Sequence, residues 1–147
     1  MLKERRINFQ KIVAITGMPG LYHLKSYNNK GFFVESYING FTRFISNAKD
    51  RVLALGNIDI AIKDGSISLL ELFQRMDQYP GRVPDEHGHD EVELSNYFEQ
   101  VIPNYDREKL FPGNMRKIVQ WYTFIKELVL ARFEEAINEA DEKLPVV

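Results

Sequence analysis

The stretch GFFVESYINGFTRFIS, residues 31–46, decides how the first half of the chain folds. Two runs rich in β-branched and aromatic residues flank its Asn39-Gly40 pair. Asn and Gly tolerate the positive φ that both central positions of a two-residue type I′ turn require. We therefore expect a β-hairpin whose register pairs Ile38 with Phe41, Ser36 with Arg43, and Glu35 with Phe44.

Further turn signals lie on both sides of this hairpin, at Pro19-Gly20, Asn28–Gly31 and Asp64-Gly65. The runs between the turns are apolar, β-branched or aromatic, and they predict strands over Leu21–Tyr27, Phe32–Ile38, Phe41–Ser46 and Ile58–Ile62. Short strands at this spacing, joined by hairpin turns, are typical of a small barrel. The first half is therefore expected to form an SH3-like barrel.

The second half has helical patterning. Ser68-Leu69-Leu70-Glu71 is a capping box, in which the hydroxyl and the carboxylate each accept a free backbone N–H, and it predicts a helix to about Gln78. Asp90 is the expected N-cap of a second helix that ends near Val101. A third helix is predicted by an apolar stripe with spacings of three and four residues: Met115, Ile118, Tyr122, Ile125, Val129, Phe133, Ala136 and Ala140. Trp121, Phe124 and Leu128 form a second stripe, so more than one face of this helix should be covered.

Charge divides the chain at the same place. Residues 1–63 contain ten Lys or Arg and four Asp or Glu, a balance of +6, whereas residues 64–147 contain nine and seventeen, a balance of −8. Either the two halves attract each other, or the basic half binds an anionic partner. We expect an α+β protein in which a small basic SH3-like barrel (1–63) packs on an acidic three-helix bundle (64–147).

Composition excludes several chemistries. The chain has no cysteine, which excludes disulfides, thiolate metal sites, iron–sulfur clusters and cysteine nucleophiles. The charged start, Met1–Arg6, does not resemble a signal peptide. No apolar run approaches the about 18 residues of a membrane span. A cytoplasmic protein that does not enter a membrane is therefore expected.

The stretch AITGMPGLYHLK, residues 14–25, poses the question of a phosphate-binding loop. A P-loop needs a Gly-Lys-Ser/Thr ending, and a dinucleotide fingerprint needs a third glycine and a following helix. A KH-type loop lies between two helices. Here Leu21 and Tyr22 follow and a strand is expected. Pro19 and Gly20 suit the second and third positions of a type II turn, so we interpret the stretch as a corner between strands, with no cofactor.

The loop Asp85–Glu91 contains the candidate metal ligands His87 and His89. Two imidazoles flanked by carboxylates suit Zn²⁺ or Ni²⁺. The alternative is a solvated polar loop that leads into the Asp90 cap. No serine lies in a Gly-x-Ser-x-Gly motif, and no other catalytic set is apparent, so an enzyme is not expected.

The aromatic residues of the hairpin are candidates for partner binding. If Phe32, Val34, Ile38 and Phe41 point inward, Phe33, Tyr37 and Phe44 lie on the opposite face. Together with nearby cations they suggest a binding surface: Lys25, Lys30, Phe33, Tyr37, Arg43 and Phe44. Aromatic and basic side chains suit single-stranded nucleic acid as well as protein. The alternative is that the long helix docks on this face.

Four motifs resemble those of a family of uncharacterised proteins from Bacteroidetes-type bacteria: AITGMPGLY (14–22), GFFVES (31–36), YFEQVIPNYD (97–106) and KIVQWY (117–122). The resemblance extends to both halves of the chain. It implies an N-terminal small β-barrel and a C-terminal helical domain. The family has no known activity, ligand or catalytic residue, so the resemblance implies none here.

These observations favour a non-enzymatic binding or adaptor protein that engages its partner through the basic barrel. A protein partner is favoured over nucleic acid because the net charge is −2. The alternative is a metal-binding protein or metal-dependent enzyme that uses the His87/His89 loop. A third hypothesis is a scaffold that assembles through apolar surface between Trp121 and Phe133. The sequence specifies no oligomeric state.

Overall fold

The computed structural model describes residues 8–46 and 52–129. A five-stranded antiparallel sheet has the order β4-β3-β2-β1-β5 and consists of β1 (Ile12–Ile15), β2 (Tyr22–Asn28), β3 (Gly31–Ser36), β4 (Thr42–Ser46) and β5 (Val52–Ala54). The short 3-10 helices η1 (Phe9–Lys11) and η2 (Leu55–Asn57) flank it in sequence. The second half contains the hairpin β6 (Asp59–Ile62) and β7 (Gly65–Ser68), followed by α1 (Leu69–Gln78), α2 (Glu91–Val101) and α3 (Pro112–Val129).

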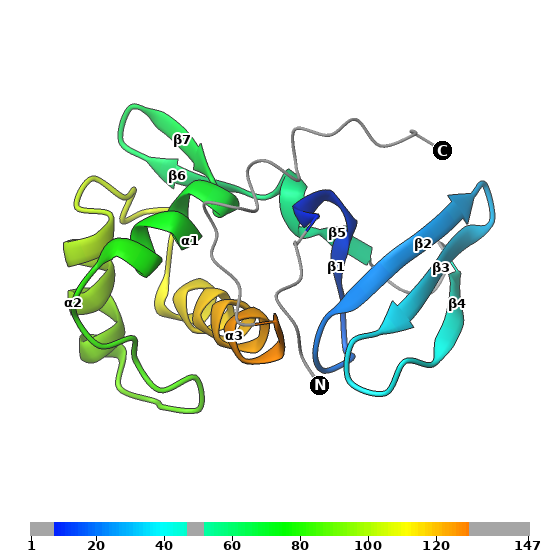
Figure 1. Ribbon diagram of the computed structural model, residues 1–147. Coiled ribbons are helices and arrows are strands. Elements are labelled where there is room, and N and C mark those ends of the chain that lie inside the picture. Colours follow the sequence, from blue (N-terminus) through cyan, green and yellow to red (C-terminus); the bar gives the residue numbers. More distant parts are fainter. Residues whose placement is uncertain (1–7, 47–51, 130–147) are drawn as a thin grey trace.

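The predicted α+β class is confirmed, but closure of the barrel is not. Figure 1 shows the sheet at one end of the molecule and the helices at the other, with α3 nearest to β1. β4 and β5 are the two edges of the sheet, and they do not pair with each other over the described residues. The sheet is therefore open in the part of the chain that the structure describes.

The larger hydrophobic core joins the two halves of the chain. It contains buried side chains from the first half, among them Phe9, Ile12, Leu21 and Leu55, together with residues of all three helices, among them Leu72, Phe73, Phe98, Met115 and Ile118. Phe9 and Phe73 make a direct edge-to-face ring contact, with centroids 5.7 Å apart. The helices therefore share their core with strand residues, and a separate three-helix bundle is not confirmed.

The β3–β4 hairpin differs from its predicted register. The structure pairs Glu35 with Thr42 and Phe33 with Phe44, two residues away from the expected alignment. A four-residue loop replaces the type I′ turn, because Ser36 Oγ accepts the N–H of Ile38 (3.0 Å) and Asn39 Oδ1 accepts that of Phe41 (2.9 Å). In a two-residue turn, Ile38 and Phe41 would belong to the paired strands. In the observed loop, their backbone N–H groups bond instead to the side chains of Ser36 and Asn39.

The longer loop also changes where its apolar side chains lie. Ile38 and Phe41 were expected to point inward, but they are 66% and 74% exposed. They belong to the loop and not to the strands, so the alternation of a strand no longer applies to them. Val34, which stays in β3, is fully buried as expected, and Phe32 is partly buried.

The glycine corner between β1 and β2 is confirmed. Gly17 and Gly20 both have positive φ (83° and 77°), and a strand follows, not a helix. The N–H of Met18 donates to the carbonyl of Ile15 at 3.0 Å, so a hydrogen-bonded turn is centred on Thr16-Gly17. The corner thus contains a hydrogen-bonded turn at Thr16-Gly17, before the Pro19-Gly20 position that was predicted, and Gly20 supplies a second left-handed position.

The predicted helix starts are confirmed. Ser68 Oγ accepts the N–H of Glu71 (3.0 Å), and Asp90 Oδ1 accepts those of Val92 (3.0 Å) and Glu93 (3.1 Å). The second half of the capping box was wrong, because Glu71 Oε2 binds Arg75 at 2.9 Å, one turn later. The end predicted for the third helix, beyond residue 129, lies outside the described residues.

Candidate functional site

A cleft of about 570 Å³ lies between the glycine corner, the loop before α2, and one side of α3. We call it the corner cleft. Its lining comprises residues 14–21 and Leu53 from the sheet, Glu86 and His87 from the loop, and Lys117, Gln120, Trp121 and Phe124 from α3. Its volume lies within the roughly 300–1,000 Å³ that is typical of small-molecule sites.

Hydrogen bonds hold the loop wall of the corner cleft against α3. Gln120 Nε2 donates to the carbonyl of Glu86 (3.3 Å), and Arg116 Nε donates to that of Gly88 (3.2 Å). At 100° per residue, the four lining residues of α3 fall within a stripe of about 100° on the helix. This stripe contains Trp121 and Phe124, so the second apolar stripe of the sequence faces the cleft.

Gly20 brings the other wall close to α3. A Cβ at this position would lie 3.2 Å from Phe124 Cε2 and 3.0 Å from Ile38 Cδ1. The residue therefore has two reasons to be glycine, its positive φ and the close approach of the Phe124 and Ile38 side chains. The glycine-containing motif that was interpreted as a corner is thus also a wall of the cleft.

His87 and His89 are exposed loop residues. The side chain of His87 is 82% exposed, and its Nε2 lies 3.9 Å from Glu86 Oε2. Within residues 8–46 and 52–129, no group of three or more His, Asp or Glu side chains is placed to hold a metal ion. The assignment of these two histidines as metal ligands stays a prediction, and the structure adds that His87 borders the corner cleft.

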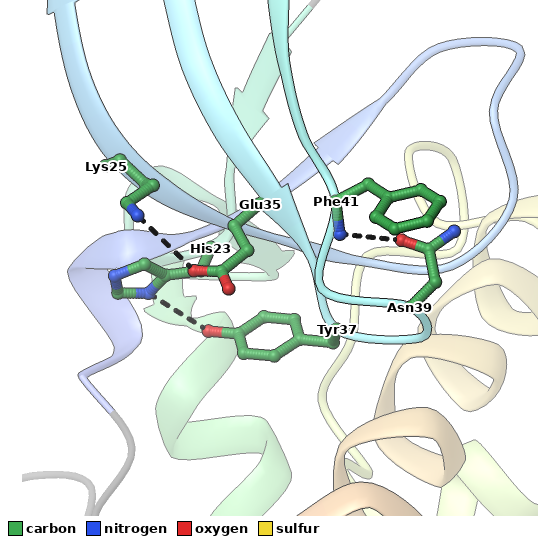
Figure 2. Close-up of polar contacts among 6 residues, drawn as sticks. All are labelled: His23, Lys25, Glu35, Tyr37, Asn39 and Phe41. Carbon is green, nitrogen blue, oxygen red and sulfur yellow. Dashed lines mark hydrogen bonds and ion pairs between the residues drawn. The ribbon is translucent and has the colours of Figure 1, made fainter.

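A second, smaller hollow of about 270 Å³ lies where β2 and β3 meet the hairpin loop. Figure 2 shows His23, Lys25, Glu35 and Tyr37 side by side at this place. The Tyr37 hydroxyl lies 3.4 Å from His23 Nδ1, and Lys25 Nζ lies 3.8 Å from Glu35 Oε1. Two of the predicted partner-binding residues, Lys25 and Tyr37, therefore belong to this polar cluster.

The remaining predicted binding residues do not all share one face. Phe33 and Phe44 are cross-strand partners whose ring centroids lie 4.9 Å apart, and they are 39% and 42% exposed. Arg43 is paired with Val34, and because side chains alternate along a strand it lies on the other face of β4. Lys30 is exposed in the β2–β3 turn. Of the three aromatic residues expected on this face, Tyr37 packs against the core that the helices share, whereas α3 does not cover Phe33 and Phe44 in the part of the chain that the structure describes.

On the opposite side of α3, a polar cluster ties that helix to α1. Asp77 Oδ1 accepts a hydrogen bond from the Tyr122 hydroxyl (2.5 Å) and lies 3.0 Å from Lys126 Nζ. Burial, and then the hydrogen bond to Asp77, raise the pKa of Tyr122. Burial also raises the pKa of Tyr97, whose buried hydroxyl has no hydrogen-bond partner in the described structure. This cluster is structural in character and lies away from the corner cleft.

The two tyrosines should respond differently to loss of the hydroxyl. Tyr122→Phe is expected to lower the free energy of unfolding by about 1.5–3 kcal/mol at pH 7, because the Asp77 carboxylate loses a donor. Tyr97→Phe should leave it unchanged or raise it, because no bond is lost. Urea unfolding of the two variants and the parent measures the difference in the free energy of unfolding. Equal losses in both variants would contradict the conclusion that only the Tyr122 hydroxyl makes a stabilising hydrogen bond.

The same tyrosines predict a loss of stability in alkali. The folded protein holds them neutral, whereas the unfolded chain ionises them near pH 10. The two tyrosines make their full contribution to the free energy of unfolding below pH 10. Above pH 10 this free energy should fall by about 1.4 kcal/mol per pH unit for each tyrosine. Urea unfolding between pH 9 and 11 should show a shallower fall in Tyr97→Phe. An identical slope in that variant would show that Tyr97 ionises normally.

From the sequence, Trp121 and Phe124 were considered only as part of an assembly surface, and Lys117 and Gln120 were not assigned to any site. The available signal was the apolar stripe with Trp121 and Phe124. It indicated that this face of the helix is covered, but it did not indicate which other segment covers it. In the described part of the chain, no helix is long and apolar enough to cross a membrane.

Comparison with known proteins finds two families, one for each half. Residues 9–55 match a domain of unknown function, DUF5606, and residues 58–125 match another, DUF6852. The solution NMR structure of a structural genomics target from Bacteroides vulgatus is similar, with 25% identity and a TM-score of 0.66. The match covers 85% of this chain and 90% of that one. No curated protein matches the sequence. These similarities fit an uncharacterised family of Bacteroidetes-type proteins.

Proposed function

We propose that this protein is a non-enzymatic binding protein whose partner is an acidic, extended protein segment that pairs with β4. The single observation that carries the proposal is the exposed pair of rings formed by Phe33 and Phe44 on adjacent strands. Aromatic side chains are enriched in protein interfaces and among the residues that contribute most to affinity.

The position of the rings at a sheet edge supports an extended partner. β4 is an edge strand of the sheet that the structure describes, and an edge strand is the position at which a further strand can pair. Phe44 belongs to this strand, and Phe41 lies immediately before it, 74% exposed. A segment that pairs with β4 would place alternate side chains beside these rings.

Charge supports an acidic partner. The strands and turns around the rings carry Lys25, Lys30 and Arg43 against one carboxylate, Glu35. Glu35 is in contact with Lys25, which leaves Lys30 and Arg43 as the cations near β4 among the described residues, with Arg43 on the face opposite the rings. Electrostatic complementarity of this kind mainly favours association rate and specificity.

The small-barrel interpretation of the sheet is part of the same proposal. The strand order of the sheet is the one expected for an SH3-like meander. The smaller hydrophobic cluster of the protein consists of buried residues from β1, β2, β3 and β4: Val13, Ile15, Tyr22, Val34 and Ile45. Mutual contact of these side chains supports a sheet that curls around them. Small barrels of this type frequently bind peptides on an exposed aromatic surface.

Selection from a displayed library of random peptides would test the proposal. Enriched peptides should be acidic with alternating apolar residues. The Phe33→Ser/Phe44→Ser variant should bind them at least about tenfold more weakly, since each ring is expected to contribute more than 1 kcal/mol. Phe111→Ser is the matched control, because Phe111 is exposed but lies before α3, and it should bind as the parent does.

A titration with labelled single-stranded oligonucleotide separates the two partner classes. Binding that weakens steeply with salt, together with failure of the peptide selection, would replace the protein partner by nucleic acid. Loss of peptide binding in the Phe111→Ser control would contradict the assigned surface.

A metal-dependent role of the His87/His89 loop is the second candidate, favoured by the position of His87 at the corner cleft. Calorimetric titration of the tag-free protein with Zn²⁺ tests it against a His87→Ala/His89→Ala variant. Affinity that is micromolar or weaker and unchanged in the variant would exclude this role.

A further inference from the structure

We propose that the corner cleft binds a small molecule with a planar aromatic ring and an anionic group, either carboxylate or phosphate. The cleft lies apart from the β4 edge, so this inference is independent of the proposed protein partner. It starts from the combination of side chains that three separate segments bring to the cleft.

The apolar part of the lining suits a flat ring. Trp121 and Phe124 are three residues apart on α3, and both are only partly buried. Met18, Pro19 and Leu53 complete the apolar lining from the side of the sheet. Aromatic side chains bind planar rings by offset or edge-to-face contacts, which add to the gain from burying apolar surface.

The polar part of the lining is rich in donors. The side-chain ammonium of Lys117 makes no ion pair or hydrogen bond with any described residue, and neither does the indole N–H of Trp121. Both belong to the α3 stripe that lines the cleft. An acceptor group on a bound molecule would satisfy both donors, and a charged acceptor would also neutralise Lys117.

One carboxylate among the described lining residues opposes an anion, that of Glu86. Its Oε2 lies 3.9 Å from Nε2 of the neighbouring His87, and its side chain is mostly buried. The backbone carbonyl of Glu86 is occupied by Gln120. Glu86 therefore lies beside an imidazole of its own loop, whereas Lys117 lies on the helix that carries the two rings.

The shape of the wall is consistent with a built site. A Cβ at Gly20 would make a tight contact with Phe124, whereas Gly17 has open space around it. The positive φ of both residues holds the corner in this form. A cleft whose walls are set by glycines and by hydrogen bonds between the loop and α3 is largely formed before a ligand arrives.

The chain contains a single tryptophan, so one indole N–H signal in a ¹H–¹⁵N NMR spectrum reports on the cleft. We would titrate the protein with adenosine monophosphate and with 1-naphthoate, which pair a ring with phosphate and with carboxylate. Adenosine lacks the anionic group, and inorganic phosphate lacks the ring. At least one of the two aromatic anions should shift the Trp121 signal saturably, with a Kd below about 1 mM. Adenosine and phosphate should bind at least tenfold more weakly.

Variants test the assignment to Lys117. Lys117→Gln should weaken binding of the aromatic anion about tenfold or more, whereas Lys109→Gln, at an exposed lysine outside the cleft, should not change it. Both variants should keep the parent spectrum away from the substituted residue.

Three results would overturn the inference. The first is the absence of a saturable shift with either aromatic anion. The second is equal binding of adenosine and its monophosphate. The third is a shift confined to the signals of β3 and β4, which would assign the anion to the sheet edge and leave the cleft without a ligand of this class.

Discussion

Replacing Phe73 with alanine is expected to lower the free energy of unfolding by about 3–5 kcal/mol, a large part of the stability of a protein of this size. Phe73 is fully buried on α1. Its ring contacts Phe9 of η1 at 5.7 Å and Tyr122 of α3 at 5.6 Å. The cavity left by the ring would remove contacts on three elements at once, one of them from the other half of the chain.

Two probes distinguish a shared core from two separate ones. Urea unfolding would be followed by far-ultraviolet circular dichroism and by fluorescence of Trp121, the single tryptophan, on α3. With a shared core the two transitions should coincide in the parent and shift together in Phe73→Ala. Phe111→Ala, at an exposed position, should change stability by less than about 0.5 kcal/mol. Separate transitions in the parent would contradict the shared core and favour two independent domains.

Replacing Gly31 with alanine should also be severe, with an expected loss of about 3 kcal/mol. Gly31 begins β3 and pairs with Ser46 of β4. A Cβ at Gly31 would overlap the backbone carbonyl of Ile45 and would lie 2.6 Å from Phe44 Cζ. A backbone atom in a paired strand cannot move aside as a flexible side chain can, so the two strands must separate locally.

Gly113→Ala is the matched control for this substitution. Gly113 lies in the first turn of α3, and a Cβ there would meet no atom within 4 Å. Alanine at such a position should be neutral or should raise the free energy of unfolding by about 0.4–1 kcal/mol. Thermal unfolding of both variants measures the contrast. Similar midpoints for the two would show that β3 and β4 tolerate a wider spacing.

Local features of the fold were predictable because each depends on atoms a few residues apart. Ser68 and Asp90 start their helices through bonds to N–H groups two or three residues further on. The left-handed φ of Gly17, Gly20 and Gly40 follows from the turns they occupy. These interactions form wherever the segment lies in the molecule, so the sequence is sufficient to predict them.

The hairpin shows where local reasoning becomes ambiguous. Asn39-Gly40 is compatible with a two-residue turn, but Ser36 and Asn39 can also satisfy the backbone of a four-residue loop. Both loops keep Val34 on the buried face, because a shift of two residues preserves the side to which a strand residue points. The choice between them depends on the packing of the loop, including Ile38 against Gly20.

The candidate sites divide in the same way. The sequence alone determined the α+β class, the helix caps, the corner at Gly17 and Gly20 and an apolar stripe through Trp121 and Phe124, because each depends on short-range geometry or on periodicity. Only the tertiary structure decided that this stripe faces the glycine corner, that His87 reaches the same cleft, and that Phe33 and Phe44 stay exposed. These arrangements bring together segments that are distant in the sequence, and their free energies depend on how whole elements pack together.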